Sequence, residues 1–195
     1  EGIAHHAVNI AFDDRLVSVP LGATTNGKVV TAYGQTEVTL DLCNLRAAGG
    51  SPTIYSAENV EIDDFDRDRP FIRFVHNGEV IEIASDLIAG CDGYHGVCRA
   101  SIPKSAITTY GQVYPFGWLG LLADTPPVSN EVIYANNKRG FALCSMRSMT
   151  RSRYYIQCDP TDHINRWSDE AFWDELRRRL PAETAEQLIT GPSLE

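Results

Sequence analysis

The second half of the chain constrains the fold most strongly, because it carries four apolar segments separated by short polar or proline-rich breaks. The segments cover residues 112–124, 130–136, 139–146 and 149–157. Pro126-Pro127, Asn136-Asn137 and the polar stretch 146–150 separate them, and residues of these types are typical of turns. Breaks this short favour hairpin connections, so we expect neighbouring antiparallel strands in one sheet.

The first half adds further strands. Apolar or β-branched runs predict them at residues 8–12, 15–20, 28–33, 53–66, 71–75 and 80–84. Asn77-Gly78 stands between the last two runs, and this dipeptide is a strong hairpin signal because both positions tolerate a positive φ. These runs extend the antiparallel pattern of the second half.

Helices are expected in only a few places. Residues 36–48 read as a helix with Glu37 in its first turn, where an acidic side chain complements the helix dipole. Ser168 can cap a second helix, and Pro181 can start a short third helix that ends near Gly191. Many strands with few helices predict an α+β fold, built on a large, mainly antiparallel sheet.

Composition narrows the classes of partner. The net charge of −9 argues against nucleic acid, whose phosphates attract basic surfaces. The longest apolar run, from Phe116 to Ala123, is too short to span a membrane. The five cysteines include no C-x-x-C pair, which argues against a disulfide framework and against a zinc site. The cysteine pattern favours a protein of the reducing cytoplasm.

The stretch from Cys91 to Arg99 contains an Asp-Gly turn followed by His95. Gly93 permits a positive φ, so the turn can set the carboxylate of Asp92 beside His95 and Arg99, two side chains suited to binding anions and phosphates. The stretch is therefore a candidate nucleotide-contacting loop. The alternative is a turn that only ends a strand.

This stretch resembles the Asp-Gly motif of the flavoprotein aromatic hydroxylases. Four further segments are similar to the same family, in the same order: 114–124, 133–136, 139–145 and 151–155. The resemblance covers nearly the whole chain. It implies FAD as the cofactor, NADPH as co-substrate, and hydroxylation of the small aromatic acid 4-hydroxybenzoate to 3,4-dihydroxybenzoate with O₂. It also implies a cytoplasmic parent enzyme that forms a homodimer.

The sequence contains no G-x-G-x-x-G, the usual opening of a dinucleotide-binding βαβ unit. We therefore expect an internal part of a larger enzyme. Residues 1–110 would be the middle of an FAD-binding domain, and residues 111–195 a truncated substrate-binding sheet with C-terminal helices. These residues alone should turn over little or no substrate. Two alternatives stay open: a non-catalytic module that binds aromatic carboxylates, and a structural fragment that binds neither ligand.

The resemblance implies that Ser145, Arg147 and Tyr155 hold the substrate carboxylate. An arginine fork binds a carboxylate through two parallel charge-assisted hydrogen bonds, and a nearby serine hydroxyl can donate a third. The alternative for Arg147 is a solvated charge at a strand end, because exposed arginines are common.

The resemblance also implies a path for the phenolic proton. Tyr134 matches a tyrosine at the phenol oxygen, and removing this proton makes the ring electron-rich for hydroxylation at the neighbouring carbon. His5 matches a histidine that ends the path at solvent, since histidine titrates near physiological pH. The alternatives are an ordinary sheet tyrosine and a surface pair formed by His5 and His6.

Five residues match cofactor contacts of the family. Gln35 matches a flavin-contacting glutamine at a helix start, where the helix dipole favours a negatively charged pyrophosphate. The alternative is that Gln35 is only a residue next to the helix cap and binds no cofactor. Arg153 matches an arginine near the flavin ring. His95 and Arg99 match residues implicated in NADPH binding, and Asp92 matches the acidic residue of the Asp-Gly motif. No metal site is expected.

Overall fold

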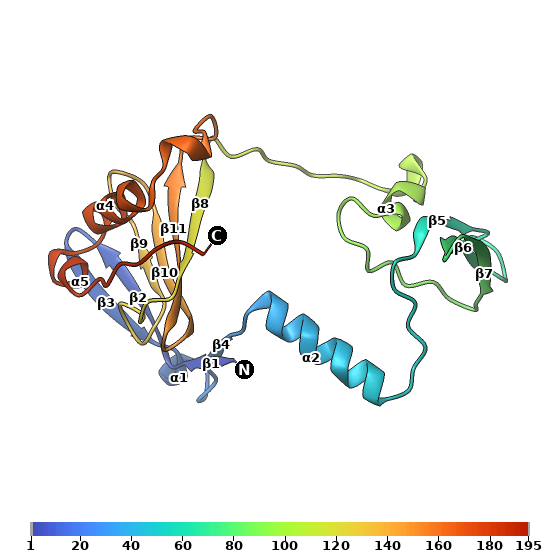
Figure 1. The fold of residues 1–195 in the computed structure, drawn as a ribbon, viewed down its shortest axis with the longest axis horizontal. Coiled ribbons are helices and arrows are strands. Elements are labelled where there is room, and N and C mark those ends of the chain that lie inside the picture. Colours follow the sequence, from blue (N-terminus) through green and yellow to red (C-terminus); the bar gives the residue numbers. More distant parts are fainter. Residues whose placement is uncertain (1, 195) are drawn as a thin grey trace. The chain divides into compact units, whose positions relative to one another are not determined.

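The computed structural model describes residues 2–194. The described chain divides into two compact units. One unit joins the residues up to Asn44 with those from Val113 onward, and the other covers Leu45–Gln112 (Figure 1). None of the helices in this part of the chain is long and apolar enough to cross a membrane.

A six-stranded sheet organises the first unit, in the order β3-β2-β9-β10-β11-β8. Its strands are β2 (Ala7–Phe12), β3 (Arg15–Pro20), β8 (Gly117–Ala123), β9 (Ile133–Ala135), β10 (Ala142–Ser148) and β11 (Arg151–Cys158). All neighbours are antiparallel except β2 and β9, which run parallel. The predicted α+β class with a mainly antiparallel sheet is confirmed.

The parallel pairing of β2 with β9 joins the first strands of the chain to the large sheet. Residues 9–11 pair with residues 133–135, so the hairpin of β2 and β3 extends the sheet of the second half. The boundary near residue 110 stays a prediction about the two functional domains. Compactness alone groups residues 2–44 with the large sheet.

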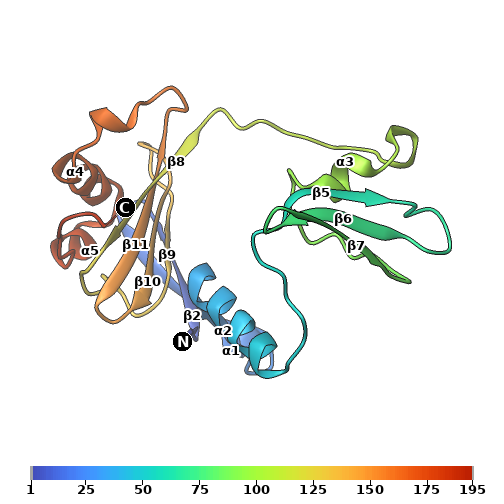
Figure 2. The same cartoon turned by 45° about the vertical axis from the view of Figure 1, so that its right-hand side comes forward.

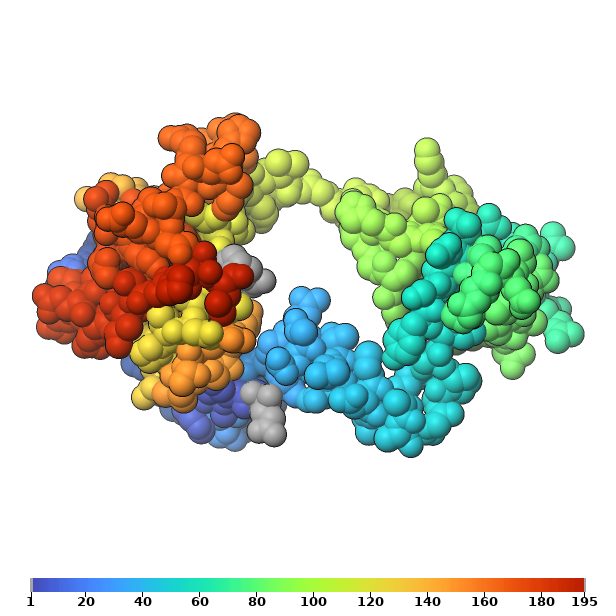
Figure 3. Space-filling view, viewed as in Figure 1, coloured from blue at the N-terminus to red at the C-terminus, as the bar shows by residue number. Residues whose placement is uncertain are grey.

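The core lies between one face of this sheet and the helices α4 (Asp169–Arg179) and α5 (Ala182–Glu186), which lie beside that face in Figure 2. Alternate strand residues such as Ile133 and Ile156 pack there against Trp173 and Leu176. In the space-filling view the orange and red atoms of the helices lie directly against the strands (Figure 3). Apolar burial on this face is therefore the main source of stability in this unit.

Local signals explain how these helices begin and end. The hydroxyl of Ser168 accepts the N–H of Ala171 at 3.2 Å, which confirms the predicted N-cap of α4. Pro181 stands directly before α5, as expected. The helix ends at Glu186, short of the predicted end near Gly191, and Leu188 beyond it packs into the core.

The remaining elements of this unit lie near its first strands. β1 (Ile3–His5) pairs with β4 (Val30–Ala32), and α1 (Leu21–Thr24) follows β3. The predicted helix at 36–48 is α2 (Gln35–Ala48), whose last residues belong to the second unit. A 3₁₀ turn at Ile164–Arg166 precedes α4.

The second unit is a three-stranded antiparallel sheet of β5 (Glu58–Asp63), β6 (Phe71–His76) and β7 (Glu79–Ala84). Asn77 and Gly78 join β6 and β7 with φ values of 52° and 81°, which confirms the predicted hairpin turn. The helix α3 (Val97–Ser101) and a 3₁₀ turn at Lys104–Ala106 follow. Phe74, 5% exposed, is the buried hydrophobic side chain of this unit among the residues described.

Candidate functional site

The face of the large sheet opposite to the helices carries most of the predicted substrate residues. Leu143 pairs in register with Tyr134 on one side and with Tyr155 on the other, and Ser145 pairs with Arg153. Directly paired residues project from the same face of a sheet. The structure therefore brings Tyr134, Tyr155, Ser145 and Arg153 onto one surface, because their sequence neighbours fill the core.

Arg147 follows two residues after Ser145, where β10 becomes irregular. The register with β11 shifts between Met146 and Ser148, so Arg147 is the extra residue of a β-bulge. A bulge bends the strand and changes the direction of a side chain. Met146 is buried while Arg147 is exposed, so the guanidinium group is free to meet a ligand from solvent.

An aromatic recess of about 580 Å³ opens on this face of the sheet. It is lined by Phe116, Trp118, Tyr134, Phe141, Leu143, Tyr155 and Gln157, which define the aromatic recess below. The rings of Trp118 and Phe141 meet edge to face at 5.4 Å, and the Tyr134 ring lies 6.0 Å from that of Phe141. Apolar walls with a few polar groups are suited to a flat, substituted ring.

Tyr155 and Arg153 lie together over a glycine. The Cζ atom of Arg153 is 5.0 Å from the centroid of the Tyr155 ring, a cation–π contact. Gly120 pairs with Tyr155, and a Cβ atom there would lie 2.9 Å from Cε1 of Tyr155 and 3.2 Å from Nη2 of Arg153. Gly120 thus leaves the space in which both side chains lie against β8. A glycine inside an apolar strand is the sequence signal for such a close approach.

Ser145 uses its hydroxyl within the sheet. Its Oγ donates to the carbonyl oxygen of Arg153 at 3.0 Å, across the strand pair. The predicted hydrogen bond from Ser145 to a substrate carboxylate would need this hydroxyl to turn away from Arg153. Its oxygen keeps lone pairs that can accept a hydrogen bond in the present orientation.

His5 lies in the interior and not on the surface. Its side chain is 2% exposed, and its Nδ1 lies 2.8 Å from Oε2 of Glu131. The alternative of a surface pair with His6 is therefore wrong for His5, although His6 itself is exposed. Glu131 was not predicted, because 126 residues separate it from His5 and no local pattern links the two.

Gln35 is the first residue of α2, as predicted. A Cβ atom built on Gly34 would lie 3.9 Å from Cδ of Arg147, so the helix start is close to the bulge of β10. The donors in this unit suit an anionic dinucleotide: a side-chain amide at a helix N-terminus and the guanidinium group of Arg153. This donor set fits FAD.

In the second unit the Asp-Gly turn is formed as expected, with a φ of 76° at Gly93. Oδ2 of Asp92 accepts the backbone N–H of Cys98 at 3.0 Å, and this hydrogen bond lowers the pKa of the Asp92 carboxyl. The apolar residues directly before this turn, Leu87 to Ala89, form no strand, so the alternative of a turn that ends a strand is wrong. Asp92 instead binds a backbone N–H at the start of α3.

His95 and Arg99 gather around one ring. The Tyr94 and His95 rings meet edge to face at 5.0 Å, and Cζ of Arg99 lies 4.6 Å from the centroid of the Tyr94 ring. Arg99 also donates to the hydroxyl of Thr109 at 3.4 Å. The structure thus brings His95 and Arg99, two of the predicted nucleotide-binding residues of this unit, to one aromatic ring.

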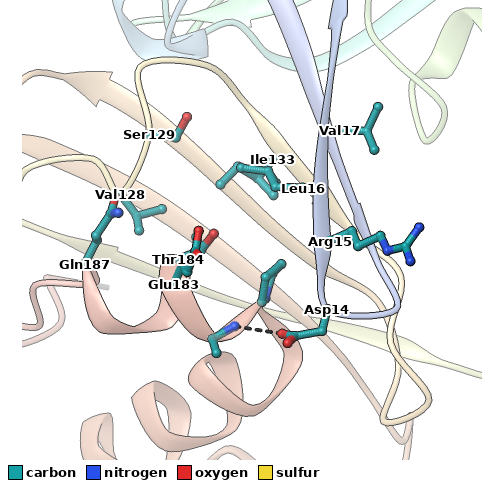
Figure 4. A pocket seen from close by; sticks show the side chains of 12 residues that line it. Asp14, Arg15, Leu16, Val17, Val128, Ser129, Ile133, Glu183, Thr184 and Gln187 are labelled. Atoms are coloured by element: carbon teal, nitrogen blue, oxygen red, sulfur yellow. Dashed lines mark hydrogen bonds between the residues drawn. The ribbon is translucent and has the colours of Figure 1, made fainter.

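A second cavity, of about 600 Å³, lies between β3, the loop before β9 and α5 (Figure 4). Oδ1 of Asp14 accepts the N–H of Ala182 at 2.8 Å, where α5 begins, and the dashed line at Asp14 in Figure 4 marks this hydrogen bond. None of the predicted site residues lines this cavity. The Asp14 contact ties the β2–β3 hairpin to α5, which is a structural role.

The family model described as FAD binding domain matches residues 1–195. The p-hydroxybenzoate hydroxylase of Acinetobacter baylyi (strain ATCC 33305 / BD413 / ADP1) is 54% identical over 195 residues, which are 100% of this chain and 48% of that protein. The chain therefore spans about half the length of the curated relative that it matches.

Solved structures show the same fold at low identity. A flavoprotein/dehydrogenase from Cytophaga hutchinsonii matches with a TM-score of 0.74 and 13% identity, over 100% of this chain and 49% of that one. The p-nitrophenol 4-monooxygenase PnpA from Pseudomonas putida DLL-E4 matches with a TM-score of 0.67 and 15% identity, over 98% and 48% of the two chains. Likenesses at this identity concern the fold alone.

Proposed function

Because this chain belongs to the FAD binding domain family, we propose that it is part of an FAD-dependent aromatic monooxygenase that converts 4-hydroxybenzoate to 3,4-dihydroxybenzoate with NADPH and O₂. One observation carries the proposal: a recess walled by aromatic rings opens on the same sheet face as Tyr134 and Tyr155, and Arg147 follows on the same strand as Leu143. An aromatic carboxylate needs these two kinds of contact, an apolar wall for the ring and a cation for the acid group.

Different residues of the chain bind the ring and the carboxylate of the substrate. The ring of the substrate packs against the aromatic recess, while the guanidinium of Arg147 and the hydroxyl of Tyr155 bind the carboxylate. The hydroxyl of Ser145 donates a further hydrogen bond to the carboxylate after it turns away from the carbonyl oxygen of Arg153. A ring without a carboxylate would leave Arg147 unpaired, so the site selects aromatic acids.

Tyr134 acts at the other end of the substrate. Its Oη accepts the phenolic hydrogen of 4-hydroxybenzoate and passes a proton on toward His5. Loss of this proton raises the electron density at the neighbouring ring carbon, which is the position hydroxylated. Benzoate lacks the hydroxyl group that Tyr134 recognises and should react poorly.

FAD, when bound, supplies electron transfer from NADPH and the activation of O₂. Gln35 and Arg153 are the residues of the first unit that we propose to hold it, through an amide at the start of α2 and a guanidinium beside Tyr155. Asp92, His95 and Arg99 are proposed to support nucleotide binding from the second unit. We further propose that the parent enzyme is a cytoplasmic homodimer.

A second candidate function is a module that binds aromatic carboxylates without turnover. The absence of G-x-G-x-x-G from the sequence favours it for these residues alone, because that loop supplies much of the usual pyrophosphate contact. The two candidate functions predict proteins of different colour. A protein that retains FAD is yellow, whereas a module that binds only the acid is colourless.

Calorimetric titration of 4-hydroxybenzoate into the chain tests the proposal, with Arg147→Ala as the variant. Hydrogen bonds to charged groups contribute roughly 1.5 to 3 kcal/mol, so the variant should bind about 10- to 100-fold more weakly. Arg151→Ala is a matched control, because Arg151 on β11 pairs with Asp124 at 2.6 Å and is half exposed. Equal affinity in wild type and Arg147→Ala would contradict the assigned carboxylate site.

A further inference from the structure

In the imidazole of His5, one ring nitrogen is hydrogen-bonded within the described part of the chain and the other is not. Nδ1 lies 2.8 Å from Oε2 of Glu131, while Nε2 is buried and has no hydrogen-bond partner among residues 2–194. The side chain is 2% exposed. Buried polar atoms are normally hydrogen-bonded, so a bare buried nitrogen calls for a functional explanation.

The contact with Glu131 decides which nitrogen carries the hydrogen. An ionised carboxylate only accepts hydrogen bonds, so Nδ1 of His5 must be the donor. In a neutral imidazole the other nitrogen then holds a lone pair and can accept a proton. His5 is thus held as the tautomer in which Nε2 is the basic atom.

Glu131 is itself held in place from several sides. Its Oε1 accepts the backbone N–H of His6 at 3.1 Å, and its own N–H donates to Oγ of Ser129 at 3.1 Å. The side-chain amide of Asn9 also donates to Oγ of Ser129 at 3.1 Å. The carboxylate therefore bridges the start of β2 and the segment that leads into β9, where Tyr134 follows three residues later.

We propose that Glu131 is a positioning residue that fixes the Nδ1–H tautomer of His5 and so keeps Nε2 ready to receive the phenolic proton. The inference rests on the proposed function of Tyr134 and His5. In this step the phenol O–H bond breaks, an N–H bond forms at Nε2, and the proton later leaves for solvent. The carboxylate of Glu131 stabilises the imidazolium that forms, because the two charges are opposite and in contact.

Glu131→Gln provides a sharp test, since glutamine has the same shape. If its Oε1 keeps the N–H of His6, its NH₂ group faces Nδ1 of His5, which must then become the acceptor. The hydrogen then moves to Nε2, and this buried nitrogen can no longer accept a proton. The opposite orientation of the glutamine would place its NH₂ group against the N–H of His6, donor against donor, and is therefore disfavoured.

The tautomer is measured by ¹⁵N NMR of the 195-residue chain labelled in its histidine rings, with His6→Ala to separate the two neighbouring signals. The wild type should show a hydrogen on Nδ1 and a bare Nε2, and Glu131→Gln should invert or mix this pattern. Glu183→Gln, a change on α5 in the same unit, should leave it unaltered. A wild-type hydrogen on Nε2, or the same pattern in Glu131→Gln, would overturn the inference.

Steady-state kinetics of the full-length protein that carries these residues provide the second readout. General acid–base catalysis contributes roughly 10²- to 10⁴-fold, so Glu131→Gln should lower kcat at least about tenfold while KM for 4-hydroxybenzoate stays close to wild type. Glu131→Asp keeps the acceptor and should recover part of kcat. A merely structural role would lower thermal stability and leave kcat of the folded enzyme unchanged.

The two proposals fail in different ways. If 4-hydroxybenzoate neither binds nor reacts, the proposed function fails, while NMR still decides whether Glu131 sets the tautomer of His5. If the acid binds and reacts but Glu131→Gln changes neither tautomer nor kcat, the proposed function stands and the inference about Glu131 is wrong.

Discussion

The two faces of the large sheet are built from the same strands and have opposite properties. On the covered face, Ile133 and Ile156 are fully buried beneath α4 and α5. On the open face, the alternate residues Trp118 and Tyr134 are 52% and 42% exposed, although both are large aromatic side chains. Period-two alternation therefore gives one surface that stabilises the fold and one that is available for a ligand.

The comparison predicts that stability and binding can be changed separately. Burial of apolar area stabilises the covered face, whereas exposed rings of the open face contribute little until a ligand covers them. Substitutions on the covered face should therefore alter the free energy of unfolding. Substitutions on the open face should mainly alter affinity for an aromatic acid.

The largest effect is expected for Leu176→Ala, in the middle of α4. Leu176 is fully buried in the core, and removing a buried leucine side chain leaves a cavity, which costs about 2 to 5 kcal/mol of stability. Urea unfolding followed by circular dichroism would measure the loss as a lower transition midpoint. A change below about 0.5 kcal/mol would mean that α4 does not cover the sheet as the structure shows.

A smaller effect is expected where α4 meets the turn between β9 and β10. Glu175 binds Nη2 of Arg139 at 2.6 Å and Nε of Arg179 at 2.9 Å, and Arg179 is nearly fully buried. Glu175→Gln removes the charge partner of that buried guanidinium but keeps one acceptor oxygen, so it should cost roughly 1.5 to 3 kcal/mol. The same unfolding assay measures it, with the exposed Asp174→Asn as a matched control.

The same ion pairs predict an acid dependence of stability. Burial raises the pKa of the Glu175 carboxyl, but the hydrogen bonds from Arg139 and Arg179 outweigh it, and the net pKa lies below the ordinary value of 4.5. The stabilisation is therefore fully present above about pH 4.5 and is lost as the pH falls through the lower folded-state pKa. Unfolding between pH 7 and pH 3 should show a steeper acid loss in the wild type than in Glu175→Gln.

Much of the fold could be predicted because its signals are local. Alternation located the strands, Asn77-Gly78 located a hairpin, and Ser168 located a helix start. The parallel pairing of β2 with β9 could not be read from the sequence, since nothing local specifies a partner more than a hundred residues away. That pairing is the reason why the first residues join the large sheet.

In the candidate site, too, local features could be predicted from the sequence and a long-range contact could not. Alternation along the strands explains why Tyr134 and Tyr155 share a surface, and it could also have identified Trp118, which occupies the same face. Glu131 could not be found this way, because its contact with His5 is made through folding alone. The residues proposed to contact the ligand were thus more predictable than Glu131, the residue proposed to position His5.

The smallest effect on stability is expected for Tyr134→Phe, which sharpens the comparison of the two faces. The ring stays in the aromatic recess and the side chain is already 42% exposed, so the free energy of unfolding should change by less than about 0.5 kcal/mol. Binding of 4-hydroxybenzoate should weaken by about 1 kcal/mol, roughly fivefold, because one hydrogen bond to the phenol is lost. Benzoate has no phenol, so its affinity should be the same for wild type and variant in the same calorimetric titration. Equal losses for the two acids would place the hydroxyl of Tyr134 away from the phenol, and the open face would then recognise only the ring and the carboxylate.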